Sequence, residues 1–399
     1  MRHPESQQVL VLLLAAAIAG VLPGSRVASA QAVAGCQLFP RDSIWNTKVD
    51  ELPLDPASAT YVATIGADTN VHPDFGSGEW PVGSGAPIGI PYTTVAAGQP
   101  LVPIGFLYAG ESDPGPYPIP PDAPIEGGPA STGDRHVLIV DTASCTLYEL
   151  FNSFPHGGGA SWSADSGAVF ALGSYALRPE TWTSADAAGL PILPGLVRYD
   201  EVAAGAIEHA LRFTVPRTRR AYVWPARHYA SSRTGAQYPP MGQRFRLRSS
   251  FDTSTFAPRI QVILTALKQY GMMLADNGSA WFLSGAPDER WDNDELRQLR
   301  QLQGSDFEAV DVSSLQVAAD SSQTALPCSG ATDLAVKDTS VVTARMFEAC
   351  DEIVVGPNFS IFGPTGSAAF HAGGRVVFSS LAVLVDGELE VATGLPLPD

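Results

Sequence analysis

Residues 182–228, WTSADAAGLPILPGLVRYDEVAAGAIEHALRFTVPRTRRAYVWPARH, hold polar, charged and aromatic side chains at a density that neither a plain core nor a plain loop requires. Residues 207–215 and 221–228 within this stretch predict two strands, because apolar and β-prone residues dominate both runs. The first run places Glu208, His209 and Arg212 among apolar neighbours. We therefore expect these two strands to form one wall of a functional site.

The rest of the chain alternates short strand-like runs with a few helical ones. The runs with strand character are residues 136–140, 146–151, 168–172, 244–250, 272–275, 280–284 and 307–312. Apolar residues at helical spacing predict a helix over residues 258–270, and shorter helices are expected over residues 196–204 and 294–303. The turn signal at residues 276–279 predicts a hairpin between its flanking strands. The fold class expected is a β-rich α+β protein, built as a sandwich or strongly curved antiparallel sheet with a few helices.

The chain divides into segments of different character. Residues 1–30 predict a signal peptide, because a basic start precedes an apolar run and an A-x-A cleavage site. Residues 31–317 form the main domain, which is expected to be catalytic. Within it, the proline-rich stretch at residues 87–129 is expected to be an ordered loop. Residues 318–327 predict a linker. Residues 328–399 predict a small all-β, solenoid-like module, because β-prone runs alternate with glycine turns.

Charge and cysteine usage limit the classes of function. The formal net charge of −17 argues against a nucleic-acid partner, whose phosphates need a basic surface. Beyond the signal region no run is long and apolar enough for a membrane span. The four cysteines predict two disulfides, Cys36–Cys145 and Cys328–Cys350, and no metal site or cofactor is expected from their spacing. We expect a secreted, periplasmic or cell-surface protein.

Two regions carry resemblances. The segments GDRHVLIVD (133–141), LYELF (147–151), TSADAAGLPILPGLVRYDEV (183–202), HALRFTV (209–215), WPARH (224–228) and YGMMLADNGSAWFLSGAPDERWDND (270–294) resemble a family of exported, largely uncharacterised bacterial proteins. This resemblance spans residues 36–312 and implies no settled mechanism. VGPNFSIFG and FHAGGRVVF in the tail are similar to β modules at the C-termini of other exported bacterial proteins.

The candidate chemistry is that of a glycoside hydrolase, which needs one carboxylic acid and one carboxylate. Glu149 lies in an apolar strand, where a raised pKa would suit a general acid, and Asp186 could supply the second carboxylate. His209 is a candidate base or donor. For each residue a structural role is the alternative: Glu149 on a solvent face, Asp186 capping a turn and His209 satisfied in the core.

Other side chains are candidates for substrate binding, because aromatic rings and arginine forks orient sugars. They are His136, Trp182, Arg198, Arg212, Tyr222, Trp224 and His228. The partner expected is a polysaccharide or oligosaccharide. Two alternatives stay open. One is a polysaccharide lyase using His209, Tyr222 and Arg212, and the other is a non-catalytic carbohydrate-binding or cell-surface protein.

Overall fold

The computed structural model describes residues 32–325 and, beyond them, strand residues between 333 and 393. It shows a β-rich α+β protein, as expected, but the larger sheets are mixed, whereas the sequence predicted a sandwich or a strongly curved antiparallel sheet. The expected signal peptide and the expected Cys328–Cys350 disulfide lie outside the described residues. In the described part no helix is both long and apolar enough to cross a membrane.

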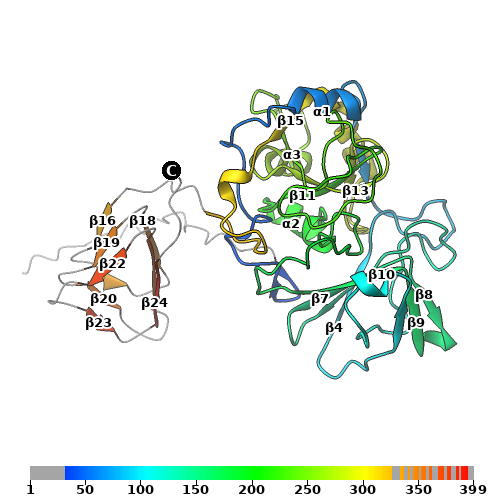
Figure 1. Ribbon diagram of the computed structural model, residues 1–399, viewed down its shortest axis with the longest axis horizontal. Coiled ribbons are helices and arrows are strands. Elements are labelled where there is room, and N and C mark those ends of the chain that lie inside the picture. The colour runs from blue at the N-terminus through cyan, green and yellow to red at the C-terminus, as the bar shows by residue number, and fades with distance from the viewer. Residues whose placement is uncertain are drawn as a thin grey trace, which may run out of the picture.

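A six-stranded mixed sheet forms the upper part of the main domain in Figure 1. Its strands, in spatial order, are β15 (Phe307–Val310), β12 (Arg244–Leu247), β13 (Met272–Asn277), β11 (Leu211–Val215), β14 (Phe282–Ser284) and β3 (His72–Asp74). All residues of the central strand β11 are buried, as is typical of a strand covered on both faces. Because β11 lies between β13 and β14, the hairpin expected at residues 276–279 is wrong.

A four-stranded mixed sheet lies below it in Figure 1. Its strands are β10 (Ser166–Ala171), β7 (Thr146–Phe151), β6 (Val137–Asp141) and β4 (Tyr92–Val95). Strand β6 has core on both faces: Leu138 and Val140 join the main core, whereas Val137 and Ile139 join a second, smaller core. The proline-rich loop completes that smaller core with the buried side chains of Tyr117, Ile119 and Ile125, so this loop is ordered as expected.

Shorter elements complete the main domain. The remaining strands are β1 (Ala32–Val33), β2 (Cys36–Gln37), β5 (Ile104–Phe106), β8 (Phe154–His156) and β9 (Ser161–Ala164). The α-helices are α1 (Ser58–Ile65), α2 (Tyr199–Ala204), α3 (Pro258–Gln269) and α4 (Asn293–Leu296). The 3-10 turns are Ala109–Glu111, Gly157–Gly159, Leu193–Gly195, Arg297–Gln301, Gly304–Asp306 and Ser313–Leu315. Helix α3 confirms the strongest helical pattern, with Pro258 in its first turn and its apolar face in the core.

Two strand predictions in the 182–228 stretch need correction. Strand β11 begins at Leu211 rather than at residue 207, because the preceding Ala210 N–H donates to the Trp45 carbonyl outside the sheet at 2.7 Å. Residues 221–228 form no regular strand. A bridge joins Tyr222 to Met241, and Pro225, which lacks an N–H, lies in a turn closed by Ala226 N–H on the Val223 carbonyl.

The segment expected to be a linker is packed on the main domain as far as Ala325. Ile44 N–H donates to the Ser322 carbonyl at 2.8 Å, and the buried hydroxyls of Thr47 and Thr324 lie 2.9 Å apart. Residues 318–325 therefore extend the main domain.

The tail strands form three parallel sheets of three strands each. The first holds β16 (Asp333–Val336), β19 (Glu352–Val355) and β22 (Arg375–Phe378), and the second holds β17 (Ser340–Val341), β20 (Phe359–Ile361) and β23 (Val383–Val385). The third holds β18 (Arg345–Ala349), β21 (Ser367–Ala372) and β24 (Glu388–Thr393). Parallel pairing of every third strand is the arrangement of a stacked solenoid.

The Cys36–Cys145 disulfide joins the segment at β2 to the turn between β6 and β7. A disulfide suggests an oxidising, extracytoplasmic location. Because the bond closes a loop with a sequence separation of 109 residues, replacing both cysteines by alanine is expected to lower the free energy of unfolding by about 4 kcal/mol. Urea unfolding of the variant and of the oxidised parent checks this. Equal midpoints would show that the bond does not constrain the unfolded chain.

Candidate functional site

A group of carboxylates lies where strand β3 of the upper sheet meets the loops that precede β6. Asp74 ends β3, Glu126 lies in the proline-rich loop, and Asp134 and His136 precede β6. We call Asp74, Glu126 and Asp134 the carboxylate cluster. Asp74 and Asp134 are exposed to solvent and Glu126 is partly exposed, so a ligand can reach all three.

His136 holds Glu126 in place and keeps it charged. The buried imidazole places Nδ1 2.6 Å from the Glu126 carboxylate and Nε2 3.1 Å from the Ala185 carbonyl. Both partners only accept hydrogen bonds, so both ring nitrogens carry a proton. Burial alone would lower the pKa of His136, but the Glu126 carboxylate raises it to about 9. Burial would raise the pKa of Glu126, yet His136 outweighs it and lowers that pKa.

The opposite shift applies to Asp74. Desolvation raises the pKa of the Asp74 carboxyl, and repulsion from Glu126 and Asp134 raises it further, while Arg212 acts in the other direction. Asp74 therefore favours its protonated form more than an ordinary aspartate does. The cluster therefore holds two carboxyl groups that interact electrostatically, Asp74 with a raised pKa and Glu126 with a lowered pKa.

The backbone at Arg135 helps to build this arrangement. Arg135 adopts a left-handed conformation, with φ 49°, which is uncommon for a side chain of this size. Its buried guanidinium donates to the carbonyls of Ser153, Pro129 and Ser131, each at 2.9 Å. These bonds hold the strained turn between Asp134 and His136. Strain of this kind persists where surrounding structure fixes it, and it is concentrated at functional sites.

Behind the cluster lies a fully buried ion pair. Arg212 donates from Nε to Asp186 Oδ2 at 2.7 Å and from Nη2 to Asp186 Oδ1 at 2.5 Å. Its third nitrogen, Nη1, donates to the Ser284 hydroxyl at 2.6 Å. Burial would lower the pKa of Arg212, but Asp186 raises it, so the guanidinium stays charged. Asp276 lies nearby, and its pKa is raised by burial and by repulsion from Asp186.

Glu149 faces the main core from β7 and is completely buried. Its carboxylate accepts hydrogen bonds from the backbone N–H groups of Ile192 and Leu193, each at 2.9 Å. Burial raises its pKa to about 7, although those two N–H groups oppose the shift. The raised pKa expected from the apolar strand is therefore present, whereas the surface position considered as an alternative is not.

This pKa has a consequence for stability. Because the folded-state pKa of Glu149 lies above its ordinary value of 4.5, its ionisation destabilises the fold as pH rises from 4.5 to about 7, by about 1.4 kcal/mol per pH unit. The Glu149→Gln variant is expected to lack this slope. Urea unfolding across that range should show the variant gaining about 3 kcal/mol relative to the parent. Parallel stability curves for the two proteins would contradict a raised pKa at Glu149.

His209 belongs to a separate buried group near α2. Its Nδ1 lies 2.8 Å from the Ala210 carbonyl and its Nε2 3.2 Å from the Glu201 carboxylate. Arg198 donates to the other oxygen of Glu201 at 2.5 Å. The structure thus brings Glu149, Asp186, Arg212 and His136 into one electrostatic network, but pairs His209 and Arg198 with Glu201 instead.

The aromatic candidates and His228 have partners outside the carboxylate cluster. The Tyr222 hydroxyl donates to the Glu180 carboxylate, and His228 Nδ1 lies 2.7 Å from the Ala187 carbonyl. Trp224 donates from its indole N–H to the Ser321 carbonyl at 2.8 Å, and Trp182 lies against the Arg178 guanidinium. All four rings are partly exposed, and each has a structural partner within the main domain.

One set of side chains in the described residues offers metal ligands. Glu126, Asp134 and His136 each place a ligand atom within 4.8 Å of the others. The hydrogen bond between His136 Nδ1 and the Glu126 carboxylate, however, already uses two of the ligand atoms that a cation would need. A metal at this set would have to displace the proton of that hydrogen bond.

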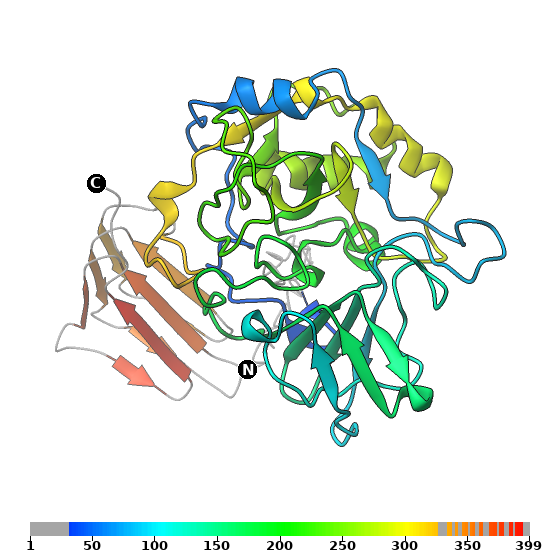
Figure 2. The same ribbon diagram turned by 45° about the vertical axis from the view of Figure 1, so that its right-hand side comes forward.

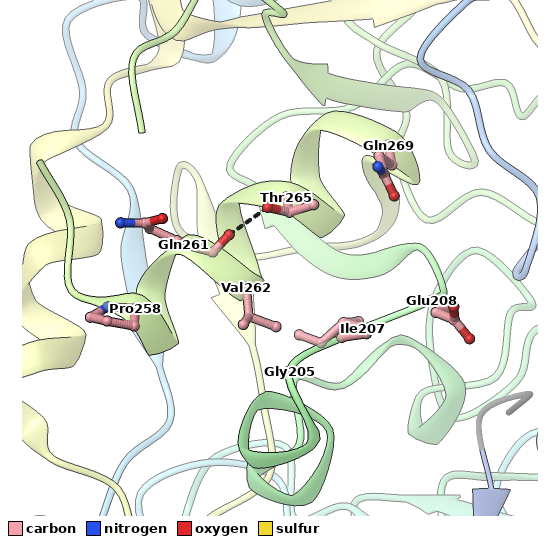
Figure 3. Close-up of a pocket in the computed structure, with 9 residues that line it drawn as sticks. Gly205, Ile207, Glu208, Pro258, Gln261, Val262, Thr265 and Gln269 are labelled. Carbon is pink, nitrogen blue, oxygen red and sulfur yellow. Dashed lines mark hydrogen bonds between the residues drawn. The ribbon is translucent and has the colours of Figure 1, made fainter. Parts of the chain in front are cut away.

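A pocket of about 270 Å³ lies elsewhere, between the end of α2 and helix α3 (Figure 3). It is lined by Gly205, Ala206, Ile207, Glu208, Pro258, Gln261, Val262, Thr265 and Gln269. Glu208 is its only side chain with an acidic or basic group. This pocket lacks the paired groups that acid–base chemistry needs.

Sequence reasoning missed the three members of the carboxylate cluster. Asp74 and Glu126 lie in irregular, proline- and glycine-rich segments without periodicity. A signal was present at Asp134–His136, because three charged or titratable residues directly precede the apolar run 137–140. No family model, curated protein or solved structure matches the chain, so the assignment of this site rests on its geometry.

Proposed function

We propose that this protein is an exported carbohydrate-active enzyme, a glycoside hydrolase that acts on a polysaccharide through the carboxylate cluster. The observation that carries the proposal is the pair Asp74 and Glu126, two solvent-accessible carboxyl groups with pKa values shifted in opposite directions. Such pairs separate the roles of acid and base in glycosidases.

In this mechanism Asp74 is the general acid. Its raised pKa keeps a proton available, which passes to the glycosidic oxygen as the bond to the anomeric carbon breaks. Glu126 is the ionised partner, held as a carboxylate by His136. It stabilises the positive charge that develops on the sugar ring, as nucleophile or as base for a water molecule.

The catalytic residues proposed from the sequence do not contact the glycan in this scheme. Glu149, Asp186 and His209 are each 0% exposed, so a polysaccharide chain does not reach them in this structure. His136 and Arg212 lower the pKa of Glu126, and His136 also holds its carboxylate in place. The lyase alternative loses support, because it assigns a uronate carboxylate to Arg212, whose guanidinium is buried and already paired with Asp186.

We also propose that the signal peptide directs the protein to the periplasm, the cell surface or the medium. We further propose that a sandwich or strongly curved sheet holds the glycan. The acidic net charge and the disulfide support an exported protein.

Incubation with a panel of polysaccharides tests the proposal. New reducing ends without ultraviolet absorbance from an unsaturated uronate are expected from at least one glycan. An unsaturated product would indicate elimination instead. Binding to a glycan without any product would favour the non-catalytic alternative.

A further inference from the structure

We infer that Trp80 is a sugar-stacking platform at the edge of the carboxylate cluster, and that the glycan it binds is neutral. This inference rests on the proposed function for its choice of ligand class. Trp80 lies in the loop formed by residues 75–90, which directly follows Asp74 and projects beyond β3 at the right of Figure 2.

This loop is adjacent to both members of the proposed acid–base pair. It leaves β3 at Asp74, and its returning limb packs on Gly128, two residues beyond Glu126. A Cβ atom on Gly128 would lie 3.0 Å from the Gly85 carbonyl oxygen and 3.3 Å from the Ala86 Cα atom, so the two backbones are in close contact. A ligand on Trp80 is therefore next to the segments that present Asp74 and Glu126.

The loop is a fixed structure. The Asn293 side chain clamps Ser77, accepting from its N–H and donating to its carbonyl, both at 3.0 Å. Trp80 N–H donates to the Ala86 carbonyl at 2.9 Å, and the Glu79 carboxylate accepts from Gly85 N–H at 2.9 Å. Because the loop is already ordered, a ligand that binds there does not have to immobilise it.

Trp80 differs in exposure from the other six tryptophans, all of which the structure describes. Its side chain is 74% exposed, whereas the others are buried or partly buried. Val82, on the same loop, is 91% exposed. A rigid loop that displays a large apolar ring to water is typical of a binding surface.

The acidic side chains around the Trp80 loop determine which class of glycan can bind there. The carboxylate cluster beside the loop presents Asp74, Glu126 and Asp134 towards solvent, and Glu79 adds a further carboxylate within the loop. The buried cations near the cluster are already paired or bonded: His136 with Glu126, Arg212 with Asp186, and Arg135 with three backbone carbonyls. A polyuronate would be repelled, whereas the apolar face of a neutral sugar ring can stack on the indole.

Affinity electrophoresis of the full chain tests the inference, in native gels that contain one soluble glycan each. The panel is mixed-linkage β-glucan, galactomannan, arabinoxylan and starch as neutral chains, with alginate and polygalacturonate as polyanions. The Asp74→Asn background slows turnover. In that background Trp80→Ala is expected to weaken retardation by a neutral glycan about tenfold or more, Trp80→Phe less, and Leu107→Ala, which removes a distant exposed side chain, not at all.

The outcomes separate this inference from the proposed function. Unchanged retardation of Trp80→Ala, stronger retardation by polyanions, or no retardation of the parent by any neutral glycan overturns the platform. If Trp80→Ala loses binding while the parent releases no reducing ends from the bound glycan, the platform stands and the hydrolase proposal fails. If the parent cleaves a glycan that Trp80→Ala binds equally well, the hydrolase stands and the platform fails.

Discussion

Asp74→Asn is expected to lower kcat on a glycan that the parent hydrolyses by about 10²- to 10⁴-fold, the range that loss of a general acid typically causes. An amide in place of the carboxyl keeps the shape of the side chain but removes the proton that the leaving oxygen needs. KM should change little, because Asp74 acts in the transition state rather than in ground-state binding. Initial rates from reducing-end release measure both constants.

The pH profile distinguishes a catalytic role from a structural one. Activity of the parent needs protonated Asp74 and ionised Glu126. It should therefore fall on the alkaline side as pH rises through the raised pKa of Asp74, and on the acid side as pH falls through the lowered pKa of Glu126. The residual activity of Asp74→Asn should lack the alkaline limb. A substrate with a better leaving group should restore much of its rate, because such a group needs less protonation.

Glu126→Gln completes the test at the partner carboxyl. This variant should lose activity with any leaving group, because a neutral amide cannot stabilise the developing charge on the sugar. Glu208→Gln, which changes the carboxylate of the pocket near α3, is the matched control and should retain parental rates. Full activity of Asp74→Asn or Glu126→Gln, with the fold intact by circular dichroism, would remove the cluster from the mechanism.

Local patterns in the sequence were enough to predict several elements. Strands β6 and β7 and helix α3 are encoded by residues close together in the chain, through short β-prone runs and through apolar residues at helical spacing. The position of β11 between β13 and β14 is not encoded locally. Its parallel pairing with β13 joins residues far apart in sequence, and the turn at residues 276–279 gave a misleading signal for a hairpin.

Only the buried residues of the site were predictable from the sequence. Glu149 and Arg212 were identifiable because charged residues in apolar strands need a reason to be there, and Asp186 because a second carboxylate was needed. Whether such a charged group takes part in catalysis or only stabilises the structure depends on its partners. Those partners come from distant segments, such as Ile192 for Glu149. The exposed Asp74 and Glu126 look like ordinary loop residues until the fold places His136 and Arg212 beside them.

Arg212→Met is expected to lower the free energy of unfolding by about 3 to 5 kcal/mol, the usual cost of removing one partner from a buried ion pair. The guanidinium satisfies both oxygens of Asp186, which is 0% exposed, and also the Ser284 hydroxyl. Without it Asp186 remains buried beside Asp276, and two carboxyl groups repel each other without a cation. Urea or thermal unfolding at pH 7 measures the loss.

The double variant Arg212→Met, Asp186→Leu distinguishes two contributions to the free energy of unfolding: the penalty for one unpaired buried charge and the net stabilisation by the intact pair. Replacing both partners by apolar side chains should recover most of the stability, because no unpaired charge is left in the core. Activity should not recover with it, because without Arg212 the pKa of Glu126 is lowered less, so Glu126 moves away from the ionised state that catalysis needs. A double variant as unstable as Arg212→Met would show that geometry around Ser284 and the β11 backbone, rather than buried charge, sets the requirement for arginine. Recovered stability together with recovered activity would show that the pair lies outside the catalytic machinery.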